Sequence, residues 1–144
     1  MAVSDAGRRW LGIAIVVGAL YAVVGMASTV LAGAVTSHAH VVWWRWAAFL
    51  VSGLVYVAHI AYERFRLGQG VRSTAWHVAL GVALGGFGLA LAANVRELGS
   101  AAAYRPRMAL ALVAWPLLTA VPAFVAALAV AAVLRRGRIP GELS

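Results

Sequence analysis

The sequence predicts an all-α integral membrane protein: a four-helix bundle of four transmembrane helices joined by short loops. Composition is the first reason. Of 144 residues, 64% are hydrophobic and 11% are charged, whereas soluble domains average about 45–50% and about 25%. The second reason is that the apolar residues gather into four runs long enough to cross a bilayer, none of which alternates like a barrel strand. At this length, residues 1–144 are expected to form a single transmembrane domain.

The four predicted spans cover residues 11–35, 46–62, 76–93 and 108–134. The first and last exceed the roughly 20 residues that a helix needs to cross the hydrocarbon core, so they have room to tilt or bend. The second and third just reach across, and Trp43, Trp44 and Trp76 flank them as interfacial anchors.

The first span carries small residues at helical spacing, including Gly18 and Gly25. Positions three and four residues apart share one helix face, and small residues there let two membrane helices approach closely. We expect this stripe to pack against another helix. A seam between two copies of the chain is the alternative.

The second span and the residue on each side of it hold a line of mostly polar side chains at steps of three and four residues, which we call the polar seam: Arg45, Phe49, Ser52, Tyr56, His59 and Glu63. Polar groups are costly in lipid, so this face is expected to point into the bundle. His59 and Glu63 are four residues apart, within hydrogen-bonding reach of each other on one helix face.

Three interpretations of the polar seam stay open. In the first, His59 and Glu63 form a buried polar pair that specifies helix packing. In the second, the seam lines a path for protons or a small solute, with His59 as the titrating group. In the third, His59 and His77 are ligands of a b-type haem or of a metal ion, and Glu63 is a further ligand in the metal case.

The third span begins near His77 and continues with a second stripe of small residues: Gly81, Gly85 and Gly88. This stripe is expected to pack closely against helices, the first span being one candidate. Under the haem interpretation, the glycines would instead make room for the flat ring, and Arg64, Arg66 and Arg72 would hold its propionates.

The fourth span contains Pro116 and Pro122, each of which removes one backbone hydrogen bond. The carbonyls of Leu112 and Leu118 lose their donors, and we expect Thr119 to satisfy one of them. The sequence therefore predicts a bend near the middle of this helix.

The charges predict orientation and partners. All twelve basic residues are Arg, and the net charge is +8. Eight lie on the side of the two termini (Arg8, Arg9, Arg64, Arg66, Arg72, Arg135, Arg136, Arg138), and four lie on the other (Arg45, Arg96, Arg105, Arg107). This bias predicts cytoplasmic termini in a plasma membrane, expected to be a bacterial inner membrane. A basic cytoplasmic face suits anionic lipid headgroups, and arginines spread over separate loops beside a membrane do not suggest nucleic acid.

The residue types that the chain lacks exclude several kinds of catalytic and metal site. The chain has no Lys, which excludes Schiff-base chemistry, and no Cys, which excludes disulfides and thiolate metal sites. The leading hypothesis is a non-enzymatic membrane protein that moves a small solute or protons as a homo-oligomer. A haem or metal redox protein and an accessory subunit of a larger membrane complex are the alternatives.

Overall fold

The fold is that of a computed structural model, which describes residues 5–99 and 106–136. Within these ranges the chain is all-helical, as predicted, with four helices: α1 (Asp5–Gly33), α2 (His38–Phe65), α3 (Val71–Leu98) and α4 (Pro106–Arg136). Each is long and apolar enough to cross a membrane. Helices α2, α3 and α4 extend beyond the predicted apolar runs at both ends, whereas α1 begins before its predicted run and ends at Gly33, two residues short of it. Arg105 and Arg138 lie outside the described residues.

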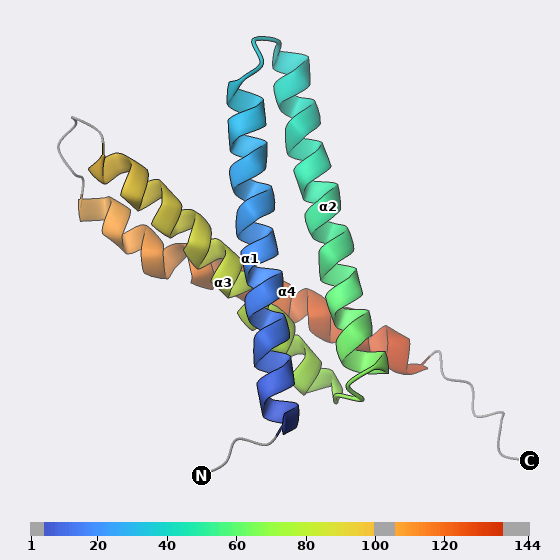
Figure 1. The fold of residues 1–144 in the computed structure, drawn as a ribbon. Helices are drawn as coiled ribbons and strands as arrows, with labels where there is room; N and C mark the ends of the chain where they lie inside the picture. Colours follow the sequence, from blue (N-terminus) through green and yellow to red (C-terminus); the bar gives the residue numbers. More distant parts are fainter. Residues whose placement is uncertain (1–4, 100–105, 137–144) are drawn as a thin grey trace, which may run out of the picture.

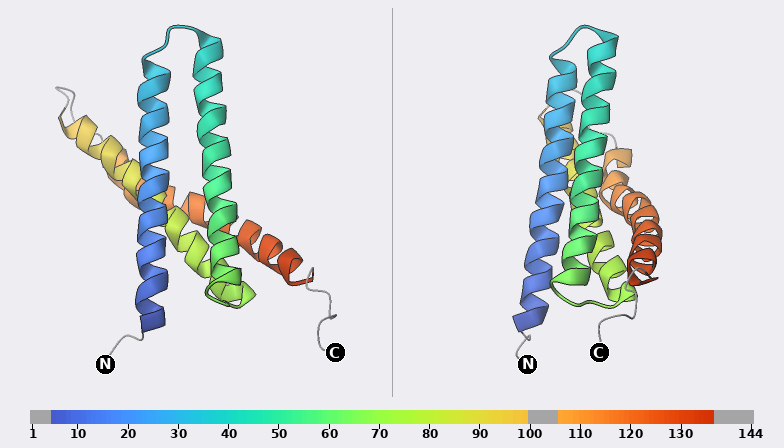
Figure 2. Two further views of the ribbon diagram at one scale, coloured as in Figure 1. Left: turned by 45° about the vertical axis from the view of Figure 1, so that its right-hand side comes forward. Right: turned by 90° about the vertical axis from the view of Figure 1, so that its right-hand side faces the viewer.

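The helices form two antiparallel hairpins, α1–α2 and α3–α4, which cross each other steeply (Figures 1 and 2). One end of the bundle, where α1 and α3 begin and α2 and α4 end, is here called the proximal end (Figure 1). At the opposite, distal end the two hairpins diverge. The bundle is therefore closed at one end and splayed at the other.

Glycines make the crossing of α1 and α3 close. A methyl group on Gly18 would lie 2.7 Å from Cβ of Leu84, and one on Gly85 would lie 2.6 Å from Cβ of Tyr21. Similarly, Gly88 faces Ala22 and Gly25 faces Leu89. The two small-residue stripes thus lie against each other, with backbones closer than larger side chains would allow.

The α3–α4 hairpin has its own close contacts. A methyl group on Gly86 would lie 2.7 Å from the Thr119 hydroxyl. Near the distal end, the buried Asn94 side chain donates hydrogen bonds to the carbonyls of Ala90 and Met108, both at 2.8 Å. Asn94 therefore joins α3 to the start of α4.

The apolar core lies toward the proximal end, between α2, α3 and α4. Its buried members are Ile60, Ala75, Val78, Ala127 and Ala131. Most of them are small, so the helices meet along narrow faces and leave the larger apolar side chains on the outside, an arrangement typical of helices that pack in lipid.

The prolines lie in a helix that curves along its length (Figure 2). Thr119, between them, donates to the carbonyls of Trp115 at 3.0 Å and Pro116 at 3.1 Å. The expectation that it reaches Leu112 or Leu118 is wrong, because a threonine hydroxyl bends back onto the carbonyls three and four residues earlier in its own helix.

Candidate functional site

Glu63 occupies the centre of a polar cluster at the proximal end. It lies in the last turns of α2, and its side chain is completely buried. An isolated carboxylate taken out of water costs several kcal/mol. Its neighbours must therefore supply protons or positive charge.

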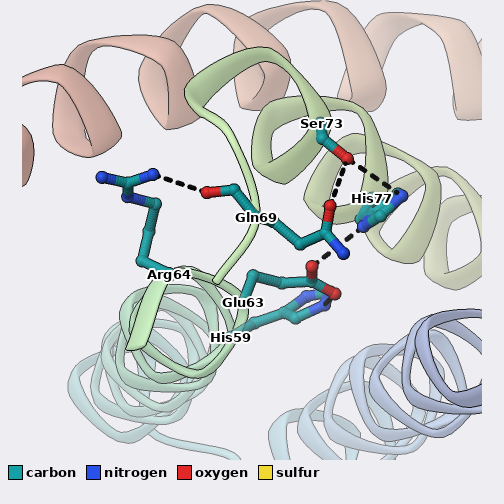
Figure 3. A network of polar contacts seen from close by, with 6 residues as sticks. All are labelled: His59, Glu63, Arg64, Gln69, Ser73 and His77. Atoms are coloured by element: carbon teal, nitrogen blue, oxygen red, sulfur yellow. Dashed lines mark hydrogen bonds and ion pairs between the residues drawn. The ribbon is translucent and has the colours of Figure 1, made fainter. Parts of the chain in front are cut away.

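Two imidazoles face the two oxygens of this carboxylate. Nδ1 of His77, in α3, lies 2.9 Å from Oε2, which is hydrogen-bonding distance. Nε2 of His59, one turn earlier in α2, lies 3.7 Å from Oε1 and completes the triad defined by these three residues. Figure 3 shows the carboxylate of Glu63 between the two rings. Three groups that can each bind one proton are thus adjacent in a buried place.

Apolar surfaces fix both rings. The indole of Trp10, in α1, stacks on His77 with ring centroids 4.2 Å apart and planes 4° from parallel. His59 is 3% exposed and lies against Gly81, where a methyl group would come within 3.3 Å of Cε1. Gly81 therefore leaves the space in which the His59 ring lies. Neither nitrogen of His59 has a hydrogen-bond partner among the described residues.

A chain of polar groups continues from His77 to the loop between α2 and α3 (Figure 3). The hydroxyl of Ser73 lies 3.5 Å from Nε2 of His77 and donates to the side-chain oxygen of Gln69 at 2.8 Å. Gln69 is partly exposed. The buried triad is thus linked through two side chains to the surface of the proximal end.

The structure buries only the proximal part of the polar seam. Arg45 is exposed and Phe49 is 69% exposed, whereas Ser52 and Tyr56 are half-buried, and His59 and Glu63 are buried. The reason is the crossing of the hairpins, because α2 moves away from α3 and α4 toward its distal end (Figure 2).

A cleft of about 710 Å³ lies where the hairpins diverge. All four helices line it, including the following side chains: Tyr21, Ser52, Tyr56, Trp115 and Thr119. Tyr56 also crosses between hairpins by donating a hydrogen bond to the carbonyl of Ala123 in α4. The cleft is mostly apolar, with a few hydroxyl groups, and the hydroxyl of Tyr21 has no hydrogen-bond partner among the described residues.

Haem does not fit this arrangement. Two axial histidines need the iron and its flat ring between them, but here the Glu63 carboxylate lies between the imidazoles, and the stacked Trp10 covers one of them. Arg64, expected to hold a propionate, points away from the triad (Figure 3). Within the described residues, no group of three His, Asp or Glu side chains is arranged to hold a metal ion.

Three members of the site are not evident from the sequence. Trp10 is far from His77 in the chain, and only the packing of α1 on α3 brings the rings together. In the sequence, Gln69 looks like an ordinary loop residue and Ser73 like an ordinary residue of a first helical turn. Ser73 precedes His77 by four residues, so helical spacing could have placed it beside that ring.

Compared with protein-family models, with curated proteins and with solved structures, the chain shows no match.

Proposed function

We propose that the chain is a small membrane protein that moves protons, or a small solute together with protons, and that the His59–Glu63–His77 triad carries the proton. The observation that carries this proposal is the buried Glu63 carboxylate, whose two oxygens face one imidazole each. Chains of carboxylates and imidazoles inside membrane helices are typical of proton relays in pumps and transporters.

The chemistry needs no large movement. The Ser73 hydroxyl donates to Gln69 in the structure; when it rotates to donate its proton to Nε2 of His77, its oxygen takes a replacement proton from water at the proximal surface. The opposite nitrogen of that ring releases a proton to Glu63, whose other oxygen faces His59. An imidazole can accept on one nitrogen and release from the other, so the charge moves while the heavy atoms stay in place.

The cleft is the place where the proposed solute would bind. It is lined by Ser52 and Tyr56, which precede His59 on α2. A small solute in the cleft would lie beside the same helix face that carries the triad. In this proposal the proximal end faces the cytoplasm, as the arginine distribution predicts.

Proton flux in proteoliposomes tests the role of the triad. The full chain is reconstituted with a trapped pH-sensitive dye, and a potassium gradient with valinomycin drives protons inward. The wild-type chain is expected to acidify the lumen faster than empty vesicles do. Glu63→Gln keeps the shape but removes the ionisable group, so the rate above that of empty vesicles is expected to fall about a hundredfold or more, as is typical for loss of a proton-transfer group.

Matched controls come from the same chain. Glu97→Gln changes a carboxylate at the distal end of α3, and His40→Gln changes an exposed histidine. Both are expected to leave the flux unchanged, whereas His77→Gln lowers it. Equal flux for Glu63→Gln and Glu97→Gln, or wild-type flux no faster than that of empty vesicles, would contradict the proposal.

The exposed side of the cleft supports a second candidate function, that of a subunit in an assembly with another protein chain. The cleft is open on the side where Phe49 and Gly53 lie, and Phe49 is 69% exposed. A second copy packed here would close the wall around the solute, which agrees with the proposed homo-oligomer. A larger membrane complex would do the same with a different chain.

A further inference from the structure

A second cavity, separate from the triad, lies at the proximal end between the start of α3 and the end of α4. Its volume is about 640 Å³. Its lining includes a basic rim of Arg64 and Arg72 and an apolar wall of Val71, Leu128 and Ala132, and Gly70 and Ser73 complete it. Ser73 is the one lining residue that the proton relay proposed above also uses; the rim and the wall take no part in it.

The basic rim has unused hydrogen-bonding capacity. Arg64 donates from Nη1 to the carbonyl of Gln69, while its Nε is buried and has no partner among the described residues. Arg72 is exposed. Among the described residues no acidic side chain lines the cavity, and Glu63, next to Arg64 in the sequence, turns to the opposite side of α2 (Figure 3). The two guanidinium charges therefore have no described carboxylate opposite them in the cavity.

The start of α3 adds to this positive potential. Gly70 precedes the helix and provides no side-chain cap, and the first turn contains no acidic residue. The first backbone N–H groups of a helix lack partners within the helix, and the helix dipole places partial positive charge there. Together with two arginines beside them, these groups suit an anion with several acceptor oxygens, as phosphate has.

The apolar wall indicates where the phosphate comes from. Leu128 and Ala132 lie on the last turns of α4, a helix whose larger apolar side chains face outward. A free phosphate ion would gain nothing from such a wall. An acyl chain or glycerol backbone would bury it, while the headgroup phosphate contacts the arginines.

We infer that this cavity binds the phosphate of one anionic phospholipid, with Arg64, Arg72 and the start of α3 around the headgroup and Leu128 and Ala132 against the glycerol and acyl region. The inference rests on the proposed membrane insertion but not on proton movement. A lipid-binding measurement on protein without a proton gradient therefore separates its failure from that of the relay.

Native mass spectrometry of the full chain in a non-ionic detergent tests the inference. Dioleoylphosphatidylglycerol and dioleoylphosphatidylcholine are added in equal amounts. One phosphatidylglycerol per chain is expected to survive removal of the detergent in preference to phosphatidylcholine. Arg72→Gln is expected to lower the phosphatidylglycerol-bound fraction about fivefold, the effect typical of one basic residue beside an anionic headgroup.

Arg66→Gln is the matched control. It removes the same charge from an exposed residue at the same end of the molecule that does not line the cavity, and it is expected to change binding less than about twofold. Arg64→Gln should act like Arg72→Gln, but it also removes the bond to Gln69, so Arg72→Gln decides the outcome if Arg64→Gln loses helix content by circular dichroism.

Three results would overturn the inference. Equal losses for Arg66→Gln and Arg72→Gln would mean diffuse attraction to a basic surface. Equal binding of the two lipids would mean that the phosphatidylglycerol headgroup is not recognised. Displacement of the lipid by millimolar inorganic phosphate would mean that the site belongs to a free anion.

Discussion

At the scale of single residues, Glu63 has the most demanding environment. Its carboxylate is completely buried, and the groups that compensate it are one imidazole from its own helix and one from α3. The positions of His77 and His59 depend in turn on Trp10 and Gly81. A change at either supporting position is therefore expected to act on the triad without altering an ionisable group.

Tyr56 offers a stability prediction at this scale. Its hydroxyl donates across the hairpins to the carbonyl of Ala123. Tyr56→Phe removes this bond with little change in shape and is expected to cost about 1 kcal/mol of unfolding free energy, as such bonds do in membrane proteins. The midpoint of unfolding in mixed micelles of increasing dodecyl sulfate content measures it.

Tyr62→Phe is the matched control for that measurement. Tyr62 lies on the same helix and is 45% exposed, and its hydroxyl has no hydrogen bond to a described residue. The free energies of unfolding of the two variants should differ by the contribution of the hydrogen bond from Tyr56 to Ala123. Equal midpoints would show that the Tyr56 bond adds nothing to stability.

At the scale of helices, the contact between α1 and α3 depends on missing side chains. Glycine inside a helix costs up to about 1 kcal/mol relative to alanine, so its repeated use needs a gain in packing. At Gly85 that gain is close approach, since a methyl group would lie 2.6 Å from Cβ of Tyr21 and 3.2 Å from the carbonyl oxygen of Gly18.

Gly85→Ala is therefore expected to destabilise the protein by about 1–3 kcal/mol, the range typical of overpacking. Gly12→Ala on α1 is the control, because a methyl group there meets no described atom within 4 Å. Helix propensity alone predicts that Gly12→Ala is neutral or stabilising by up to about 1 kcal/mol. The same micelle titration compares them, and a neutral Gly85→Ala would contradict the close crossing of the helices.

At the scale of the whole molecule, the crossing of the hairpins determines that the proximal end encloses the triad and that the cleft is open. At the proximal end α2 and α3 hold the triad between them, and toward the distal end the same two helices separate around the cleft. This shape agrees with a homo-oligomer in which a second copy covers the open side, since four helices alone leave that side uncovered.

The natural absence of cysteine allows a direct test of this assembly. Phe49→Cys places the chain's single thiol at the open side of the cleft and is expected to form a covalent dimer under mild oxidation in membranes. Leu118→Cys, which is equally exposed on α4 but does not line the cleft, is expected to stay monomeric. A monomer for Phe49→Cys, or equal dimer yields for both variants, would contradict a second copy at the cleft.

The sequence by itself determined the helical class, the number of helices and their apolar character, because lipid requires long apolar segments with internally satisfied backbones and such segments are visible in one dimension. It also indicated Glu63, His59 and His77, since polar side chains are rare in such segments. Only the tertiary structure decided that the carboxylate lies between the imidazoles, that Trp10 stacks on His77, and that the distal half of the polar seam is open. The physical reason is that helical periodicity fixes which residues share a face, whereas the angle at which two hairpins cross depends on how closely their glycines allow the backbones to approach.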